Sequence, residues 1–327
     1  SSDTEASYSS RRSSLFSVMS AEDTDIDASV DEPRFARTQE HHICSLDISS
    51  NHISTLENLV TSRVEVLPNL CKLEHLHLSD NDLTQVPVEV FKALSSLKSL
   101  SLNNNRLNAF PVFTGSCPKL ASLNLASNLI ETLTFSCLES LLLVELNVSK
   151  NKLTQFPVGI EKAYPHLSKL NISSNLIQAL PSEPCNLTDL RCLDISHNSF
   201  KVLPDDFLRN CPRLETLIAV NNGLEVLPNE SIASCLPRLT TVKLSNNNIT
   251  EREPFYIPKF ILELPNVRTV DLSCNGLVGC PLPSMWKTQM LKELMLSKNN
   301  ITKLNLEGAR QWSKLEKLHL SYNKISE

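Results

Sequence analysis

The chain of 327 residues is 41 % hydrophobic and 20 % charged, with a net charge of −5 at pH 7. Acidic and basic residues are mixed throughout, which argues against a nucleic-acid-binding protein because such proteins carry a basic stripe. No apolar run reaches the length that spans a bilayer, and the N-terminus has no apolar signal-peptide core, so no direct membrane insertion is expected.

The cysteines give an indication of the compartment. The chain has ten, scattered along its length without a paired cluster. Some of them, such as Cys117 and Cys211, stand a few residues ahead of a recurring leucine, where a small apolar side chain packs well. We therefore expect free thiols in a reducing compartment, which predicts a cytoplasmic protein.

Residues 1–38 read as a disordered, Ser-rich acidic leader. Ten of the first 29 residues are serine, and such a composition buries too little apolar surface to offset the entropy of the chain. Arg11 stands three residues before Ser14, a spacing typical of basophilic kinase sites. Ser13, Ser14 and Ser17 are the candidate phosphorylation sites. The alternative is an ordinary polar linker.

Residues 39–327 repeat one pattern. The stretch from Leu97 reads Leu-Lys-Ser-Leu-Ser-Leu-Asn-Asn-Asn-Arg-Leu, and its apolar frame returns about twelve times. Each copy fixes one asparagine, and successive asparagines lie 23 to 30 residues apart. These asparagines are Asn51, Asn81, Asn105, Asn128, Asn151, Asn175, Asn198, Asn222, Asn247, Asn275, Asn299 and Asn323.

Such a period identifies the leucine-rich repeat. It predicts an α/β solenoid, or horseshoe, with one curved parallel sheet of about twelve strands and short helical or irregular convex segments. The two leucines of each Leu-x-Leu point to the same inner face because strand side chains alternate with period two. The asparagine amides are expected to bond unpaired backbone groups of adjacent coils as a structural ladder, with no catalytic role.

Two steps between asparagines are long and predict insertions. One places extra chain around residues 57–69, and the other carries the aromatic residues Phe255, Tyr256 and Phe260. Insertions in solenoids go to surface loops, often on a contact face. Phe255 and Tyr256 are therefore candidate partner contacts. The alternative is that these aromatic side chains fill the convex packing layer.

Motifs for enzyme chemistry are absent from the sequence. The six glycines form no phosphate-binding loop, and neither a His-Glu-x-x-His nor a paired Cys-x-x-Cys motif occurs. His75 and His77 share one face of a strand beside Asp47, but the next strand offers only Ser99 and Ser101, which are poor metal ligands. We predict a solvated surface there, with no catalytic residue, cofactor or metal in this segment.

The concave face is the remaining candidate for function. Its outward positions are mostly polar and of both charges, except that one repeat places Ile218 and Val220 outward and the small Ala219 inward. An apolar spot on a polar sheet is a plausible contact centre. The alternative is that these two residues are ordinary scattered surface hydrophobics.

The last two repeats carry a more specific resemblance. Residues 291–299 read Leu-Lys-Glu-Leu-Met-Leu-Ser-Lys-Asn, and a second block runs from Trp312 to Asn323. Both blocks resemble the repeat domain of the leucine-rich repeat kinases of the Roco family, most closely its second vertebrate paralogue. The Ser-rich leader running into residues 42–51 fits the same domain junction.

This resemblance implies a larger protein. Roco kinases carry a Roc GTPase, a COR dimerisation segment and a serine/threonine kinase after the repeats, with ATP, GTP and Mg bound there. The chain stops after its twelfth asparagine without a polar capping segment, so we expect a fragment of a longer protein.

The resemblance also implies a function. It suggests a non-catalytic, autoinhibitory and protein-binding domain that folds over the kinase domain of its own chain, and a phosphorylated leader that recruits 14-3-3 proteins. No proline stands two residues after Ser13, Ser14 or Ser17, which departs from the usual 14-3-3 motif. The alternative is a stand-alone adaptor that binds protein partners on its concave face.

Overall fold

The structure is a computed structural model that describes residues 43–57, 70–113, 115–135, 142–250, 256–280 and 282–326. Within it, His42–Glu327 forms one compact unit. The predicted leader and the insertion at 58–69 lie outside the described residues, and so do residues 251–255.

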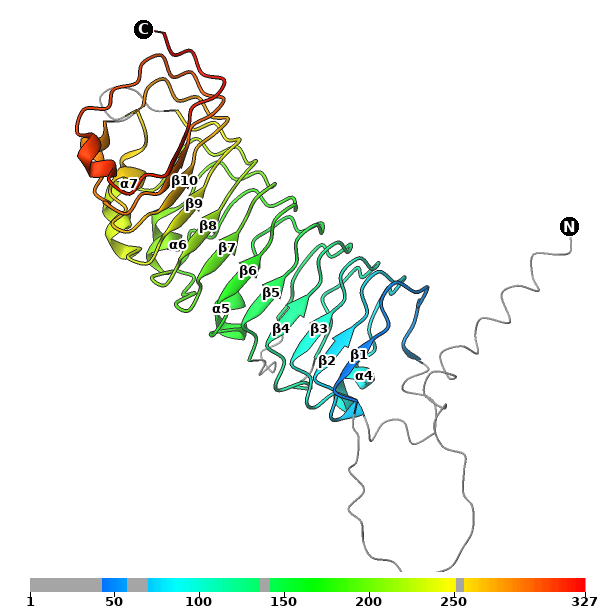
Figure 1. The fold of residues 1–327 in the computed structure, drawn as a ribbon. Coiled ribbons are helices and arrows are strands. Elements are labelled where there is room, and N and C mark those ends of the chain that lie inside the picture. The colour runs from blue at the N-terminus through cyan, green and yellow to red at the C-terminus, as the bar shows by residue number, and fades with distance from the viewer. Residues whose placement is uncertain are drawn as a thin grey trace, which may run out of the picture. The chain divides into compact units, whose positions relative to one another are not determined.

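Twelve strands of three residues each form a single sheet (Figure 1). Their centre is always an aliphatic residue flanked by two side chains that point the other way. The strands are β1 (Ser45–Asp47), β2 (His75–His77), β3 (Ser99–Ser101), β4 (Ser122–Asn124), β5 (Glu145–Asn147), β6 (Lys169–Asn171), β7 (Cys192–Asp194), β8 (Thr216–Ile218), β9 (Thr241–Lys243), β10 (Thr269–Asp271), β11 (Glu293–Met295) and β12 (Lys317–His319).

The sheet is entirely parallel, and its strand order is the sequence order. The central residues lie in register, so that Leu46 pairs with Leu76 and Leu76 with Leu100. The single curved parallel sheet predicted from the repeat is thereby confirmed. Adjacent strands are about 4.8 Å apart, so equivalent residues of neighbouring repeats stand side by side in rows.

The recurring leucines build one continuous core. In the repeat of β5, both Leu146 and Val148 are buried, because residues two apart on a strand share a face. A fully buried aliphatic side chain of this kind contributes about 1.5–3 kcal/mol to stability. Burial falls at the last repeat, where Leu318 and Leu320 are only partly buried.

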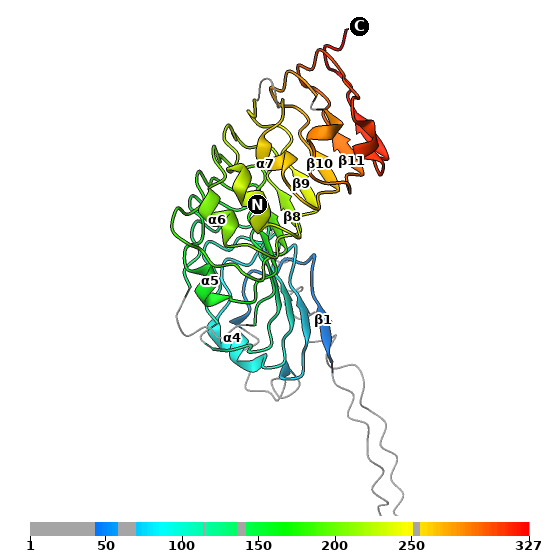
Figure 2. The ribbon, with the colours of Figure 1, turned by 90° about the vertical axis from the view of Figure 1, so that its left-hand side faces the viewer.

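Short helices return the chain on the side away from the strands (Figure 2). Prolines directly precede α4, α6 and α7, because a residue that cannot donate a backbone hydrogen bond is tolerated where a helix begins. The helical segments are α4 (Val88–Ala93), α5 (Ile160–Ala163), α6 (Asp205–Arg209), α7 (Lys259–Leu262) and the 3₁₀ helices η1 (Glu230–Cys235), η2 (Pro283–Met285) and η3 (Ala309–Trp312).

Aromatic rings fill the layer beneath these helices. Phe113 is fully buried, with its ring centroid 4.5 Å from that of Phe91. Phe260 of α7 is also buried, as the packing alternative for the aromatic insertion predicts. Near the C-terminal end, the rings of Trp286 and Trp312 pack edge to face with centroids 6.4 Å apart. Such pairs add about 0.5–1.5 kcal/mol beyond their area burial.

A tight turn follows each strand. The residue just before each repeat asparagine has a positive φ of 53–57°, as at Lys150 and Tyr322. This left-handed conformation turns the chain at the end of the strand, and the side chain of the following asparagine reaches the preceding coil, as Asn81 reaches Ile48.

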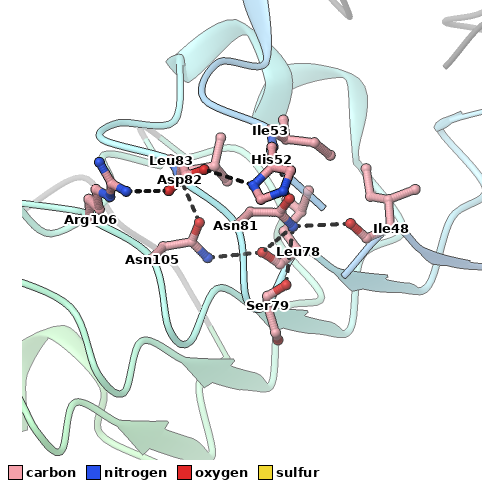
Figure 3. A network of polar contacts seen from close by, with 10 residues as sticks. All are labelled: Ile48, His52, Ile53, Leu78, Ser79, Asn81, Asp82, Leu83, Asn105 and Arg106. Carbon is pink, nitrogen blue, oxygen red and sulfur yellow. Dashed lines mark hydrogen bonds and ion pairs between the residues drawn. The ribbon is translucent and has the colours of Figure 1, made fainter. Parts of the chain in front are cut away.

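The asparagines connect each coil to the one before it (Figure 3). Asn81 Oδ1 accepts the Ile53 backbone N–H at 3.0 Å, and Asn81 Nδ2 donates to the Ile48 and Leu78 carbonyls at 3.0 and 3.1 Å. Asn105 repeats this pattern one coil further along. Each amide therefore satisfies buried backbone groups of two coils at once.

The ladder differs at two places. Among the described residues, Asn51 bonds only within its own coil, donating to the Ile48 and Ser49 carbonyls. Asn222 donates to Ile195 and Val220 but makes no bond to Ala219, the residue at its own inner position. The eighth repeat is therefore held by fewer amide bonds than its neighbours.

Candidate functional site

The third residue of every strand forms a continuous row on the concave face, which we call the end row. It consists of residues that point away from the core and pair in register across the whole sheet. The members are Asp47, His77, Ser101, Asn124, Asn147, Asn171, Asp194, Ile218, Lys243, Asp271, Met295 and His319.

Asparagine and aspartate side chains in the end row are held in place by hydrogen bonds from the backbone of the following turn. Asn147, Asn171 and Asp194 each accept, through Oδ1, the backbone N–H of the residue two positions later, at 2.9–3.0 Å. This leaves Nδ2 of Asn147 and Asn171 without a hydrogen-bond partner among the described residues. The two amides are therefore preorganised donors for an external group.

Ile218 is an end-row residue that cannot accept a hydrogen bond from its own turn. Because its side chain has no oxygen, the Val220 backbone N–H is instead satisfied by Ser196 Oγ of the preceding coil, at 3.1 Å. Ile218 and Val220 both face outward and are half-buried, while Ala219 between them is fully buried. The two apolar side chains lie together on a mostly polar face.

A shallow hollow of about 340 Å³ lies beside this apolar pair. It lies over strands β4 to β7 and reaches Ile218 of β8 at one end. Its lining residues are Ser122, Leu123, Asn124, Glu145, Leu146, Asn147, Lys169, Leu170, Asn171, Cys192, Asp194 and Ile218.

One ion pair lies on the hollow's lining. Lys169 Nζ is 2.6 Å from Glu145 Oε1, and this hydrogen bond raises the pKa of Lys169 above its ordinary value. Both side chains are exposed, so the pair adds at most about 1 kcal/mol to stability. It sets a local charge pattern and does not hold the fold together.

Other residues singled out in the sequence lie elsewhere. Tyr256 is in the segment between β9 and α7, has a φ of 56°, and covers Gly279, where its ring leaves no room for a Cβ. Phe255 and the leader serines Ser13, Ser14 and Ser17 lie outside the described residues. Tyr256 therefore does not join Ile218 in one row.

Metal and thiol chemistry find little support in the described part of the chain. His77 pairs in register with Asp47, yet no group of three or more His, Cys, Asp or Glu side chains there is arranged to hold a metal. Burial raises the pKa of the Cys117 and Cys211 thiols to about 12, so both stay protonated and unreactive near neutral pH.

The preorganised amides of Asn147 and Asn171 were not recognisable as binding groups from the repeat alone. The sequence carries one indication of their geometry, because Asn-x-Ser at the end of a strand predicts a local side-chain cap. No comparable pattern indicates the hydrogen bond from the Val220 backbone N–H to Ser196 Oγ, because these two residues belong to different coils.

No helix in the described ranges combines the length and apolar character needed to cross a membrane.

Comparisons with known proteins agree on the architecture. The leucine-rich repeat family model matches residues 71–130, 142–200, 165–224 and 265–325, which is more than half of the chain. A TDR receptor structure is 26 % identical, with a TM-score of 0.66, and the match covers 86 % of this chain and 47 % of that one.

Two further structures share the fold. An internalin (inlF) from Listeria monocytogenes is 18 % identical, with a TM-score of 0.62, and the match covers 87 % of this chain and 82 % of that one. The structure of the LRIM1/APL1C complex is 22 % identical, with a TM-score of 0.62, and the match covers 79 % of this chain and 50 % of that one. The chain therefore belongs to the leucine-rich repeat family, whose arrays are protein-interaction domains and generally non-catalytic.

Proposed function

We propose that the concave face binds a protein segment in a contact centred on Ile218 and Val220. The observation that carries this proposal is the apolar pair itself: Ile218 lies in the mostly polar end row with Val220 beside it, and Ser196 Oγ accepts the Val220 backbone N–H. Side chains at the centre of an interface that become fully desolvated supply most of the binding energy. The LRIM1/APL1C complex gives a precedent for protein partners on this fold.

Ile218→Asp is the test of this contact. Protein fragments selected from a displayed library on the folded array should lose at least about thirtyfold in affinity for this variant, the loss typical of a central hot spot. Val158→Asp is the matched control, because Val158 is 76 % exposed on the convex side and should leave binding unchanged. Equal binding by wild type and Ile218→Asp would refute the contact.

We further propose, from the resemblance to the Roco family, that the bound segment belongs to a kinase domain of the same protein. The array would then be an autoinhibitory domain of a cytosolic multidomain GTPase and serine/threonine kinase. Cytosolic placement is favoured by the scattered cysteines, whose buried thiols pack as small apolar side chains. The second candidate, a stand-alone adaptor, uses the same face for a partner in trans.

The leader supports a separate proposal. Phosphorylated Ser13, Ser14 or Ser17 would present a doubly charged group beside Arg11 and bind a 14-3-3 phosphoserine reader. A synthetic peptide of residues 8–20 phosphorylated at Ser14 should bind a 14-3-3 protein in fluorescence polarisation, and the unmodified peptide should not. Equal binding of both peptides would show that the phosphate is not what is recognised.

A further inference from the structure

The end row has an ordered charge pattern around Ile218. Asp194, Ile218, Lys243 and Asp271 occupy equivalent positions on the successive strands β7 to β10 and pair in register. The apolar side chain therefore stands between an acid on one side and a base on the other. All four side chains are half-buried on the curved face.

The charges on either side of Ile218 are not neutralised by ion pairs with described residues. Equivalent residues of neighbouring coils often form ion pairs, such as Glu74 with Lys98 at 2.7 Å. Asp194 and Lys243 make no ion pair with any described residue, and the Asp194 carboxylate accepts only the Ser196 backbone N–H among the described residues. Unpaired charges beside an apolar centre are available to a partner of opposite charge.

The spacing of the row selects the shape of that partner. With strands about 4.8 Å apart, Asp194 and Lys243 are separated by about 10 Å, with Ile218 midway. Successive turns of an α-helix are 5.4 Å apart, so residues i, i+3 or i+4, and i+7 fall almost on these three positions. An extended peptide places same-face residues about 6.7 Å apart and drifts out of step by the third position.

We propose that the concave face receives an amphipathic α-helix of a partner protein, with a basic, an apolar and an acidic side chain on successive turns opposite Asp194, Ile218 and Lys243. This inference rests on the proposed concave contact and gives the chemistry of its occupant. The hollow over β5 and β6 lies where the helix continues, and the free Nδ2 groups of Asn147 and Asn171 donate there to acceptors on its next turns.

The test is a selection on the folded array from two displayed libraries. One presents a single helix on a rigid scaffold, randomised along one face, and the other presents linear twelve-residue peptides. The helical library should enrich Lys or Arg, a large aliphatic or aromatic residue, and Asp or Glu at i, i+3 or i+4, and i+7. A helical library that yields no binder, or binders without this pattern, overturns the proposal.

Charge reversal makes the test specific. Lys243→Glu removes no described side-chain bond, so the array should fold normally, yet it should weaken the selected helices about tenfold or more through like-charge contact. Repeating the selection on this variant should enrich a basic residue in place of the acidic one. Lys201→Glu carries the same charge change at an exposed position off the strands and should have no effect.

The outcomes separate this inference from the proposed contact. Binders that are lost with Ile218→Asp but indifferent to Lys243→Glu leave the concave contact standing and refute the helix pattern. Linear peptides that alone respond to Lys243→Glu indicate an extended partner and refute it as well. Binders indifferent to both substitutions refute the contact and the helix together.

Discussion

Replacing Asn247 by alanine is expected to lower the free energy of unfolding by about 3 kcal/mol or more, because it leaves buried backbone groups without partners. Asn247 Oδ1 accepts the Leu224 backbone N–H at 3.1 Å, and its Nδ2 donates to the Ala219 and Leu244 carbonyls, both at 2.9 Å. The whole residue is only 7 % exposed, so water cannot readily replace these bonds.

The loss of stability at Asn247 should be larger than at most other repeat asparagines, because one of the carbonyls that it bonds has no second asparagine donor among the described residues. The Leu244 carbonyl keeps a second bond from Asn275, but the Ala219 carbonyl receives none from its own repeat asparagine. Removing the Asn247 amide therefore strips the Leu224 N–H and the Ala219 carbonyl together. Each unsatisfied buried group costs about 1–3 kcal/mol.

Asn248→Ala supplies the matched control. It is the same substitution one residue later, but the Asn248 side chain is exposed and makes no hydrogen bond among the described residues. Its urea midpoint should change little, while that of Asn247→Ala should fall clearly in the same experiment. Similar midpoints for the two variants would show that the amide bonds do not hold the coils together.

Deleting residues 43–327 from a parent protein that carries a kinase domain is expected to raise kinase activity on a protein substrate about fivefold or more. The reason is thermodynamic coupling: a domain that binds the inactive arrangement lowers the active population, and couplings of this kind are typically 1–3 kcal/mol. Initial rates at saturating ATP, normalised to the amount of folded kinase, measure the effect.

A point substitution separates loss of the concave contact from other consequences of deleting the whole array. Ile218→Asp in the intact parent should raise activity in the same direction while leaving the array folded, since the side chain lies outside the core. Val158→Asp should leave activity at the wild-type level. Unchanged activity after deletion would refute autoinhibition and favour the stand-alone adaptor.

Much of the architecture follows from the sequence alone. The period of 23 to 30 residues predicts the strand positions, because the two leucines of Leu-x-Leu share one buried face only in an extended strand, as Leu100 and Leu102 do at Ser99–Ser101. The asparagine positions follow from the same frame. Ile218 and Val220 could likewise be assigned outward from their alternation with Leu217 and Ala219.

What the sequence could not determine is how equivalent residues of different coils interact. Only the register of the sheet places Ser196 Oγ against the Val220 N–H, leaves Asp194 and Lys243 on either side of Ile218, and encloses the hollow over β4 to β8. The physical reason is that leucine and asparagine periodicity reports burial and turns within one coil. Contacts across coils depend on side chains more than 20 residues apart, which meet only after the coils have stacked.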